Sequence, residues 1–574
     1  MSIETASSSK PMVANDEVVA TSTINVAISH ETSNNDEPIL SDNFKYYKKK
    51  SLVSVSLYSN RIEFSGSKPP LKQTVSLANV IGTKIGKGHT KSDQNAYLTI
   101  YIYTNQTNIN NNNNNSKISR RKRIVLELEC SKFGSNFDEN LQYVNTWHLK
   151  IDDLLRQEIF HRFLKTNQDL TKITSDDYKT RLSKPFLILV NPKSGAGKAK
   201  NLYHEHILPV MAEANLNNTV VFTQHANHAR EYVKSIKLDD WRGIVVVSGD
   251  GLIYEVINGL MDRTDWHQAI KIPIGQIPGG SANAVVCCIS YLTNEAFKGL
   301  SLESFAKNAS FNLVKSIQTP LDLIFYEQAN RKLVTSCLAF EWAIIADVDL
   351  ESEKYRYLGG MRFLVGALKR ILKLRIYRGR LSFLLSDSSQ TYKPKSTNIN
   401  VTQYNQINKD DNNNENEPNK NTQSEHLVEN IKFKYLRPLN EKVPNNWVTI
   451  EDNFVLFLVV YLPLIAPDFL AAKESKFNDG NMHLVFIKEG ITKTELLNLF
   501  TLTEEGDHLN HPLVEYVKIK AFRLEPLPLN NSNNGNNNRE GIMMVDGEQV
   551  PCEPIQAEII PSMANILANV KLDN

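Results

Sequence analysis

The spacing of hydrophobic and polar positions divides the chain into three blocks. Residues 44–165 contain short runs in which apolar and polar residues alternate, which is typical of β-strands with one buried face. The block ends in residues 136–163, where apolar residues recur at helical spacing. We therefore expect a β domain that is closed by one amphipathic helix. The expected strands are residues 52–57, 61–64, 96–103 and 124–128.

The second block, residues 184–315, alternates continuous apolar runs with helical patterns. Such alternation predicts an α/β domain whose parallel sheet is covered by helices on both faces. Ligands of these sheets bind at the carboxyl ends of the strands, so we expect a binding site in the turns that follow the apolar runs. The runs are residues 186–190, 220–222, 244–247 and 272–277.

From residue 316 onward the pattern consists mostly of strands, with one strong helix at residues 357–374. We expect a C-terminal antiparallel β-sandwich domain over residues 316–565. Its most apolar run, residues 454–466, is shorter than the ~20 residues that a helix needs to span a bilayer, and it predicts a buried strand.

Three Asn-rich stretches interrupt the chain, one in the first block and two in the third. Such segments cannot bury enough apolar area to offset the entropy that is lost on ordering. We expect all three stretches to be disordered loop insertions, with the two later ones at residues 395–428 and 529–539, and residues 1–43 to be a disordered tail. The stretches are residues 105–115, 405–423 and 530–538.

Composition and length limit the classes of partner and the compartment that we expect for this chain. Lys and Arg number 65 and Asp and Glu number 63, a net charge of +2 that gives no reason to expect nucleic acid. Five scattered cysteines are too few for a disulfide framework or a zinc site and fit a reducing compartment. The first 40 residues lack the apolar stretch of a secretory signal. The 574 residues suffice for about three domains of a cytoplasmic protein, whose contact with any membrane would be peripheral.

The first of three Gly-containing turns reads NPKSGAGK at residues 191–198. Gly195 and Gly197 let backbone N–H groups approach an anion at the start of a helix, and two lysines add positive charge. No Ser or Thr follows Lys198, so the turn differs from a Walker A loop. Taken alone, it fits a nucleotide site and an ordinary turn equally well.

The second turn places Asp250 between Gly249 and Gly251, directly after an apolar run. Its carboxylate either faces the expected cleft or caps the next helix, which is a common use of Asp. The third turn supplies Gly280 and Ser281 at a further helix start, where N–H groups can bind phosphate. Three such turns in order within one α/β block are a strong signal for a phosphate site.

The motifs of these turns resemble the catalytic core of the diacylglycerol-kinase-like lipid kinases. The resemblance is carried by SGDGLIYEVINGL at 248–260 and PIGQIPGGSANA at 273–284, and IADVDLESEKYR at 345–356 resembles the sphingosine kinase branch in particular. It resumes near the C-terminus through DGNMH at 479–483 and VDGE at 545–548. The resemblance implies an α/β nucleotide-binding domain and an ATP- and Mg²⁺-dependent transfer of phosphate to the primary hydroxyl of a sphingoid base, giving sphingosine 1-phosphate.

The resemblance also implies roles for individual residues. Asp250 matches the catalytic base for the lipid hydroxyl, and Asp349 matches the residue that recognises the sphingoid amine. Ser248, Gly249 and Gly251 match contacts to the lipid head. The first loop departs from the commoner family pattern, with Ser and Ala where Gly and Lys can occur. The positions that match ATP contacts are Asn191, Pro192, Lys193, Lys198, Thr223, Gln224, His225, Ala226, Asn227, Glu255, Gly280, Ser281, Ala282, Arg356, Arg362, Asp546, Gly547 and Glu548.

Several alternatives stay open. Acidic residues alternate from Asp347 to Glu353, so this segment could equally be a solvated face. A ceramide or diacylglycerol kinase is a second hypothesis, although its substrate lacks the ammonium group that Asp349 would bind. A non-catalytic lipid-binding scaffold is a third, although Asp250 and all three turns are retained. The sequence also leaves a homodimer open.

Two further segments bear on contact with lipid. The strands and closing helix of residues 44–165, with Trp147 on the helix, resemble a pleckstrin-homology domain, and RRKR at 120–123 could meet anionic head groups or be a solvated strand end. An apolar stripe on the helix at 357–374 fits plain core, the roof of an acyl-chain pocket or a surface that rests on a membrane. We expect His483 to be a packed core histidine. The stripe consists of Leu358, Met361, Val365, Leu368 and Leu372.

Overall fold

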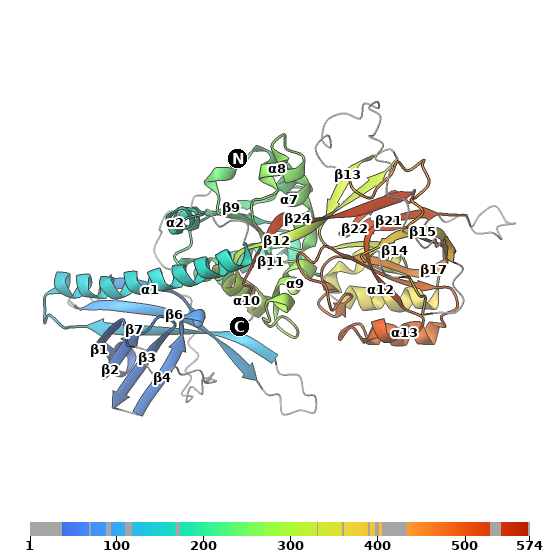
Figure 1. Cartoon of the computed structure of the whole chain (residues 1–574). Helices are drawn as coiled ribbons and strands as arrows, with labels where there is room; N and C mark the ends of the chain where they lie inside the picture. Colours follow the sequence, from blue (N-terminus) through green and yellow to red (C-terminus); the bar gives the residue numbers. More distant parts are fainter. Residues whose placement is uncertain are drawn as a thin grey trace.

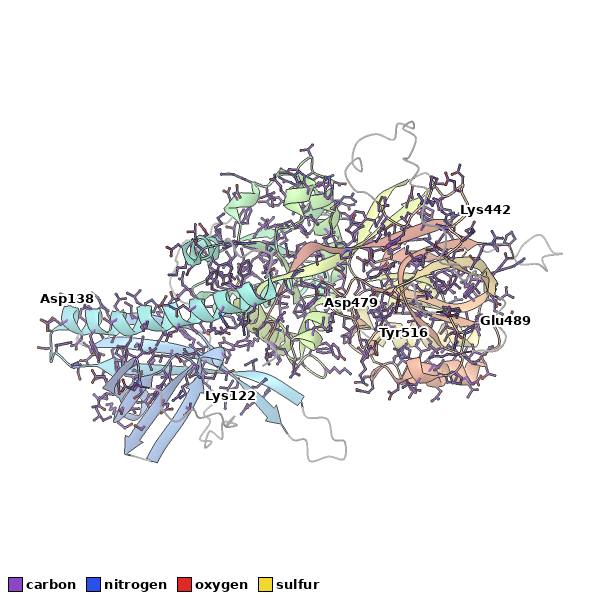
Figure 2. All side chains as sticks on the ribbon, in the orientation of Figure 1. Lys122, Asp138, Lys442, Asp479, Glu489 and Tyr516 are labelled. Atoms are coloured by element: carbon purple, nitrogen blue, oxygen red, sulfur yellow. The ribbon has the colours of Figure 1, made fainter. Side chains whose placement is uncertain are left out.

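The computed structural model describes residues 37–67, 70–87, 93, 95–108, 118–167, 173–329, 331–358, 361–387, 391–395, 401–403, 433–528 and 541–571. Figure 1 shows three regions in a row: an N-terminal β region, a central α/β region and a C-terminal β region. Figure 2 shows Asp138, in the first region, and Glu489, in the last, at opposite ends of the molecule. Most of the expected tail and of the Asn-rich stretches lies outside the described residues.

A seven-stranded antiparallel sheet forms the N-terminal region, in the order β4-β3-β2-β1-β7-β6-β5. Its closing helix, α1 (Phe137–Thr166), lies along the sheet in Figure 1. Trp147 of α1 is buried and meets Phe44 of β1 edge-on, with ring centroids 5.2 Å apart. The expected strands and helix are therefore present. The strands are β1 (Leu40–Tyr46), β2 (Ser51–Leu57), β3 (Arg61–Ser67), β4 (Pro70–Ser76), β5 (Val80–Lys87), β6 (Ala96–Asn108) and β7 (Ile118–Cys130).

The basic patch at residues 120–123 attaches the N-terminal region to the central one. Arg121 is buried, and its Nε donates a hydrogen bond to Glu295 at 3.1 Å. Arg123 donates from Nε to Glu213 at 2.7 Å. Arg121 thus forms an ion pair inside the molecule, whereas the side chain of Arg123 is 51% exposed. For Arg121, both expectations, lipid head groups and a solvated strand end, are wrong.

The central region is a parallel sheet in the order β9-β8-β10-β11, with β24 (Ile555–Ala568) as its next strand. Leu187 and Leu189 of β8 pack with α6 and α7, whereas Ile188 and Val190 pack with α4 and α10 on the other face. Helices thus cover both faces, as the alternating pattern predicts. The elements are α2 (Ser175–Ser183), β8 (Phe186–Val190), α3 (Ser194–Gly197), α4 (Ala199–Leu202), α5 (Leu208–Glu213), β9 (Asn218–Phe222), α6 (His228–Ser235), β10 (Gly243–Ser248), α7 (Asp250–Met261), α8 (Trp266–Ala269), β11 (Ile274–Pro278), α9 (Ala284–Leu292) and α10 (Leu302–Val314).

The C-terminal strands continue the same sheet. β24 pairs in parallel with β11 through Ile566 and Ile274, and in antiparallel with β12 and β21. The expected antiparallel region is therefore present, but one 15-stranded sheet joins it to the parallel region. The remaining elements are β12 (Ile317–Gln328), β13 (Arg331–Ser336), β14 (Ala339–Ala343), α11 (Ile344–Ser352), α12 (Met361–Leu372), β15 (Tyr377–Leu385), β16 (Val401–Gln403), β17 (Val448–Val460), β18 (Leu464–Ala466), β19 (Phe469–Leu470), β20 (Met482–Lys488), α13 (Lys493–Thr501), β21 (Glu515–Pro526), β22 (Met543–Val545) and β23 (Glu548–Val550).

The apolar stripe of α12 faces outward rather than inward. Its described side chains are between 36% and 72% exposed, so the plain-core interpretation is wrong. The buried side of the helix carries Arg362, Gly366, Ala367, Arg370 and Ile371. Within the part of the chain that the structure describes, no helix is both long and apolar enough to cross a membrane. The exposed residues are Met361, Val365, Leu368 and Leu372.

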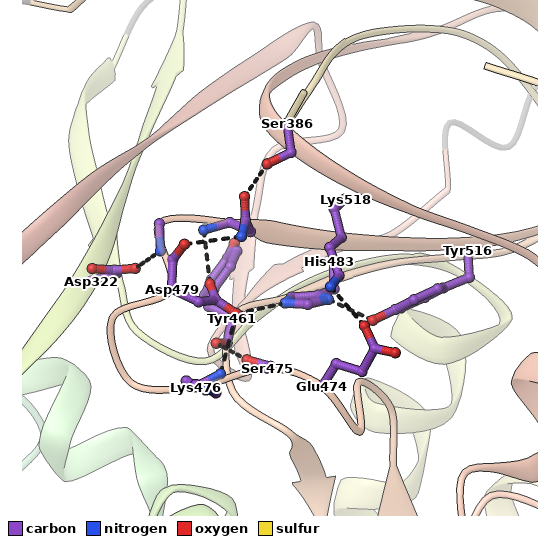
Figure 3. A network of polar contacts seen from close by, with 12 residues as sticks. Asp322, Ser386, Tyr461, Glu474, Ser475, Lys476, Asp479, His483, Tyr516 and Lys518 are labelled. Carbon is purple, nitrogen blue, oxygen red and sulfur yellow. Dashed lines mark hydrogen bonds and ion pairs between the residues drawn. The ribbon is translucent and has the colours of Figure 1, made fainter. Parts of the chain in front are cut away.

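His483 is a fully buried member of a polar network in the C-terminal region (Figure 3). Its Nδ1 lies 2.7 Å from the hydroxyl of Tyr516, and its Nε2 lies 3.3 Å from Oδ2 of Asp479. Asp322 of β12 accepts a hydrogen bond from the backbone N–H of Gly480 at 2.6 Å. This bond connects the turn before β20 to β12. The expectation of a packed core histidine is confirmed.

Candidate active site

The three Gly-containing turns meet at the carboxyl ends of β8, β10 and β11. Asn191 follows β8, Gly249 follows β10 and Gly279 follows β11. Residues of all three turns line one cavity of about 1040 Å³. The parallel sheet therefore gathers turns that are far apart in the sequence at one edge, where a ligand is expected.

Two glycines allow these turns to approach one another. A Cβ atom on Gly280 would lie 2.4 Å from Cα of Gly249, and one on Gly195 would lie 2.5 Å from the carbonyl oxygen of Gly279. Gly195 also has a φ of +58°, which residues with a side chain rarely adopt. The two positions require glycine because the backbone of one turn packs directly against the backbone of the next.

Asp250 is the first residue of α7 and lines the cavity. Its Oδ2 accepts a hydrogen bond from the backbone N–H of Ala284 at 2.9 Å, and its Oδ1 accepts one from Val285 at 3.0 Å. The carboxylate therefore does not cap its own helix but lies at the N-terminus of α9, where N–H groups favour negative charge. Burial raises the pKa of Asp250 above its ordinary value, and these hydrogen bonds oppose that shift.

Gln276 of β11 fixes the orientation of Asp250. Its Nε2 donates to Oδ1 of Asp250 at 3.3 Å and to the carbonyl oxygen of Ser248 at 3.2 Å. Its Oε1 accepts from the backbone N–H of Val286 at 2.7 Å. Sequence reasoning missed this residue because it lies within the apolar run before the third turn and not in the turn itself. Its polarity within a buried strand was the available signal.

Most residues that the resemblance implicates surround the cavity. Pro192 and Asn227 do not line it, and the side chain of Arg356 lies outside the described residues. Oε2 of Glu255 accepts a hydrogen bond from the backbone N–H of Ala229 at 3.1 Å, which holds the start of α6 beside the cavity. The implicated residues that line it are Asn191, Lys193, Lys198, Thr223, Gln224, His225, Ala226, Ser248, Gly249, Asp250, Gly251, Glu255, Gly280, Ser281, Ala282, Asp349, Arg362, Asp546, Gly547 and Glu548.

Asp546 brings the C-terminal region to the cavity. Its carboxylate accepts hydrogen bonds from the three backbone N–H groups of residues 337–339 at 2.9 to 3.0 Å, and one from the hydroxyl of Ser336. Burial raises the pKa of Asp546, and these bonds oppose that shift. Because its carboxylate is engaged in this way, Asp546 holds the turn that presents Gly547 and Glu548 to the cavity.

The acidic segment that ends at Glu353 lies largely on helix α11, so its side chains do not alternate across a strand. Asp347 is 1% exposed and accepts a hydrogen bond from the hydroxyl of Tyr377 at 2.9 Å. Asp349 lines the cavity, with its Oδ1 at 3.5 Å from Nη2 of Arg362. A solvated face is therefore wrong for Asp347, and Asp349 is the aspartate of this helix that faces the cavity.

The part of the cavity that the C-terminal region forms is largely apolar. Helices α11, α12 and α13 contribute to it, together with the short ribbon of β18 and β19. One continuous cavity thus joins the polar turns to an apolar wall. The apolar lining residues of this region are Leu338, Ile345, Val348, Phe363, Leu364, Ala367, Ile465, Ala466, Phe469 and Phe500.

The described residues contain no group of three or more His, Cys, Asp or Glu side chains that could hold a metal ion. Mg²⁺ commonly binds through one or two carboxylates together with phosphate oxygens and water. A Cβ on Gly251 would lie 3.6 Å from Oε1 of Glu548, so this carboxylate reaches the turn that carries Asp250. Glu548 therefore fits a Mg²⁺ site that is completed by nucleotide phosphates.

Comparison with known proteins finds matches to both the central and the C-terminal region. The family model of the diacylglycerol kinase catalytic domain matches residues 185–323, and the YegS C-terminal NAD kinase beta sandwich-like domain matches residues 466–568. The chain is 35% identical to human sphingosine kinase 1, over 66% of this chain and 88% of that protein. It is 28% identical to human sphingosine kinase 2, over 90% of this chain and 88% of that protein.

The similarity to sphingosine kinases also includes a plant protein. Sphingosine kinase 1 of Arabidopsis thaliana is 32% identical, over 67% of this chain and 73% of that protein. Together with the geometry of the turns, these matches show that the chain belongs to the sphingosine kinase family, whose catalytic core is the diacylglycerol kinase catalytic domain.

Proposed function

We propose that the chain transfers the γ-phosphate of ATP to the primary hydroxyl of sphingosine or another sphingoid base. The observation that carries the proposal is the single cavity that combines Asp250 and the phosphate-binding turns with an apolar wall. A lipid kinase needs both, because its acceptor has a polar head and a hydrocarbon chain. Family membership supports the same reaction, since the relatives are named sphingosine kinases.

The turns supply the features that ATP requires. Lys193 and Lys198 and the N–H groups of residues 280–282 would bind the phosphates, with Arg362 adding a cation from α12. The turn after β9 would contact the nucleoside, and Gly547 and Glu548 would approach from the C-terminal region. In this proposal, Pro192 and Asn227 act by shaping their turns, and Arg356 remains a phosphate-binding residue by resemblance alone. The nucleoside contacts are Thr223, Gln224, His225 and Ala226.

Asp250 would act as the general base. The acceptor oxygen forms a bond to the γ-phosphorus while Asp250 takes the hydroxyl proton, and the bond from the γ-phosphorus to the bridging oxygen of ADP breaks. The N–H groups of Ala284 and Val285 and the amide of Gln276 hold the carboxylate in place for this transfer. Mg²⁺, held by the phosphates and Glu548, would neutralise charge on the phosphates.

Asp349 would bind the ammonium group of the acceptor. It lines the same cavity as Asp250, on a helix that also contributes Ile345 and Val348 to the apolar wall. An ammonium near a partly buried carboxylate gains a charge-assisted hydrogen bond. Ser248, Gly249 and Gly251 are the proposed contacts for the rest of the head.

The outer surface of α12 would rest on a lipid bilayer. Leu364 is 50% exposed and also lines the cavity, so the exposed stripe and the apolar wall meet on one helix. A lipid acceptor could then enter without crossing water. We further infer that the N-terminal region is a pleckstrin-homology-like domain, because seven antiparallel strands are closed by a helix whose Trp147 is buried against them.

The alternatives predict different acceptors. Ceramide and diacylglycerol lack the ammonium group, so Asp349 would have no cationic partner. A non-catalytic scaffold would not require the hydrogen bonds that orient Asp250. A radiolabelled-phosphate assay of the wild type and of Asp250→Asn on sphingosine, ceramide and diacylglycerol tests all three hypotheses. We expect labelled product from sphingosine with the wild type alone. Preferential labelling of ceramide or diacylglycerol, or no turnover of any lipid, would contradict the proposal.

A further inference from the structure

Glu341 lies at a position of β14 where the fold favours an apolar side chain. Its neighbours in the strand, Phe340 and Trp342, point into the aromatic core of the C-terminal sheet, so Glu341 faces the opposite side. The residues directly across from it are Leu458 on β17 and Met544 on β22. A carboxyl group between two apolar partners carries a desolvation cost that packing does not offset.

The side chain of Glu341 opens into the cavity. It is 9% exposed, and it lines the same cavity as Asp250 and Asp349. Its Oε2 is buried and has no hydrogen-bond partner among the described residues. Buried polar atoms in native proteins are nearly always paired, so an unpaired one that borders a substrate cavity points to a ligand group.

The surroundings determine which kind of group fits. Burial raises the pKa of Glu341 well above its ordinary value, and the nearby carboxylates of Asp349 and Asp546 raise it further, whereas Arg362 opposes them. These surroundings therefore favour the protonated carboxyl group of Glu341 more than they would for an exposed glutamate. A protonated carboxyl group donates one hydrogen bond through its O–H and accepts others, which suits a hydroxyl. An ammonium group would instead bind Asp349, which lies on helix α11 and not between two apolar side chains of neighbouring strands.

The order of polar groups along a sphingoid base matches this arrangement. The first carbon carries the hydroxyl that is phosphorylated, the second carries the amine, and the next carbons carry one or more further hydroxyls before the hydrocarbon chain begins. Asp250 would serve the first and Asp349 the second. Glu341 is the remaining acidic side chain of β14 and α11 that lines the cavity, whose apolar wall includes Ile345 and Val348.

We propose that Glu341 binds a hydroxyl group of the acceptor on the carbons beyond the amine, and that it thereby selects for hydroxylated sphingoid bases. The inference rests on the proposed sphingoid-base kinase function and deepens it. A site that is built to hydrogen-bond a substrate hydroxyl discriminates strongly against an analogue that lacks it, because the protein group is then left unpaired in a buried place.

The test compares two acceptors that differ in this hydroxyl alone. Sphinganine carries it, and 2-aminooctadecan-1-ol has the same chain, amine and primary hydroxyl without it. The wild type, Glu341→Leu and Glu341→Gln are assayed on both, and the ratio of the two kcat/KM values is the readout. We expect the wild type to prefer sphinganine by about 10-fold or more. Glu341→Leu should bring the ratio close to one. Glu341→Gln should keep most of the preference for sphinganine, because an amide can also donate and accept hydrogen bonds.

Two controls make the outcome decisive. Met544→Leu alters the neighbour of Glu341 in the sheet and should leave the ratio unchanged. Thermal unfolding of each variant separates binding from folding, and we expect Glu341→Leu to be at least as stable as the wild type. If Leu lowers both kcat/KM values equally, or leaves the wild-type ratio intact, the role of Glu341 is refuted while the kinase function stands. If the wild type phosphorylates neither base, both proposals are refuted.

Discussion

Nη2 of Arg362 lies 3.5 Å from Oδ1 of Asp349, so two side chains with different proposed partners are paired with each other. Arg362 would serve the phosphates of ATP, and Asp349 would serve the amine of the lipid. A phosphate that attracts Arg362 leaves Asp349 with less compensation for its charge, and this favours binding of the ammonium group. If both proposed roles hold, this ion pair would couple the binding of the two substrates.

Replacing Asp349 should affect the lipid more than the nucleotide. We expect Asp349→Asn to raise the KM for sphingosine about 10- to 100-fold, the loss expected for a charge-assisted hydrogen bond of about 1.5–3 kcal/mol, with a smaller change in the KM for ATP. Steady-state kinetics with each substrate varied in turn provides the measurement. Asp347→Asn is the matched control, because Asp347 is buried away from the cavity and should alter stability rather than the ratio of KM values. Equal changes in both KM values for Asp349→Asn would indicate a structural role.

Replacing Asp250 should abolish catalysis without unfolding the protein. Asp250→Asn keeps the size of the side chain but removes the base, so we expect kcat to fall by about 10²–10⁴-fold. Thermal unfolding should show a folded protein of somewhat lower stability, because the amide oxygen of Asn can accept one of the two backbone hydrogen bonds at the start of α9 and its NH2 group cannot accept the other. Turnover close to that of the wild type would remove Asp250 from the mechanism.

Gly280 and Gly249 provide a matched pair for testing the contact between the turns. A Cβ on Gly280 would lie 2.4 Å from the backbone of Gly249, whereas the nearest atom to a Cβ on Gly249 is 3.4 Å away. We expect Gly280→Ala to separate the turns and to lower kcat/KM for ATP by roughly 10²-fold, as small misplacements of reacting groups do. Gly249→Ala should have a much smaller effect. The reverse ranking in the same kinetic assay would be inconsistent with this packing.

One buried ion pair should contribute strongly to the attachment of the N-terminal region. Arg121 pairs with Glu295 and its guanidinium lies 3.8 Å from the ring centroid of Phe311. Arg121→Met leaves the carboxylate of Glu295 buried and unpaired, so we expect a loss of about 3–5 kcal/mol in the free energy of unfolding, measured with a chemical denaturant. Arg120→Met, on the exposed side of the same strand, is the control and should change little. Similar stability of the two variants would contradict the inferred attachment.

His508 should make stability sensitive to acid. Its ring lies 5.4 Å from that of Phe469 in the cavity wall, and burial lowers its pKa to about 4. In the unfolded chain the ordinary pKa is about 6.5, so between these values the unfolded state binds a proton that the folded state does not. The contribution of neutral His508 is therefore complete above pH 6.5 and is lost as the pH falls toward 4. At most it amounts to about 3 kcal/mol.

His508→Leu removes this titration and should flatten the decline in Tm between pH 6.5 and 4 relative to the wild type. His161→Leu, at an exposed position of α1, should leave the decline as it is. Parallel Tm curves for His508→Leu and the wild type would show that His508 does not titrate in this range.

The central site could be predicted from sequence because its parts are local patterns. The apolar run at residues 186–190 becomes β8 without change, and Asp250 begins a helix directly after a strand. Parallel strands bring their carboxyl ends to one edge, so the meeting of the three turns follows from the order of elements alone. The acidic helix and the C-terminal motif also reach the cavity, with Asp349 and Glu548 as their contributions.

Tertiary structure decided what depends on distant pairings. Ile566 pairs with Ile274 in the parallel part of the sheet, and Arg121 forms an ion pair with Glu295 in another region. Neither contact can be predicted from local periodicity. The stripe of α12 has the spacing of a core face, yet it lies outside because the opposite side of the helix, at Gly366, packs against Val348 and Ser352 of α11. Alternation along a strand or helix fixes which residues share a face. What that face contacts is decided by packing between segments that are far apart in the sequence. This packing places Glu341 at the cavity.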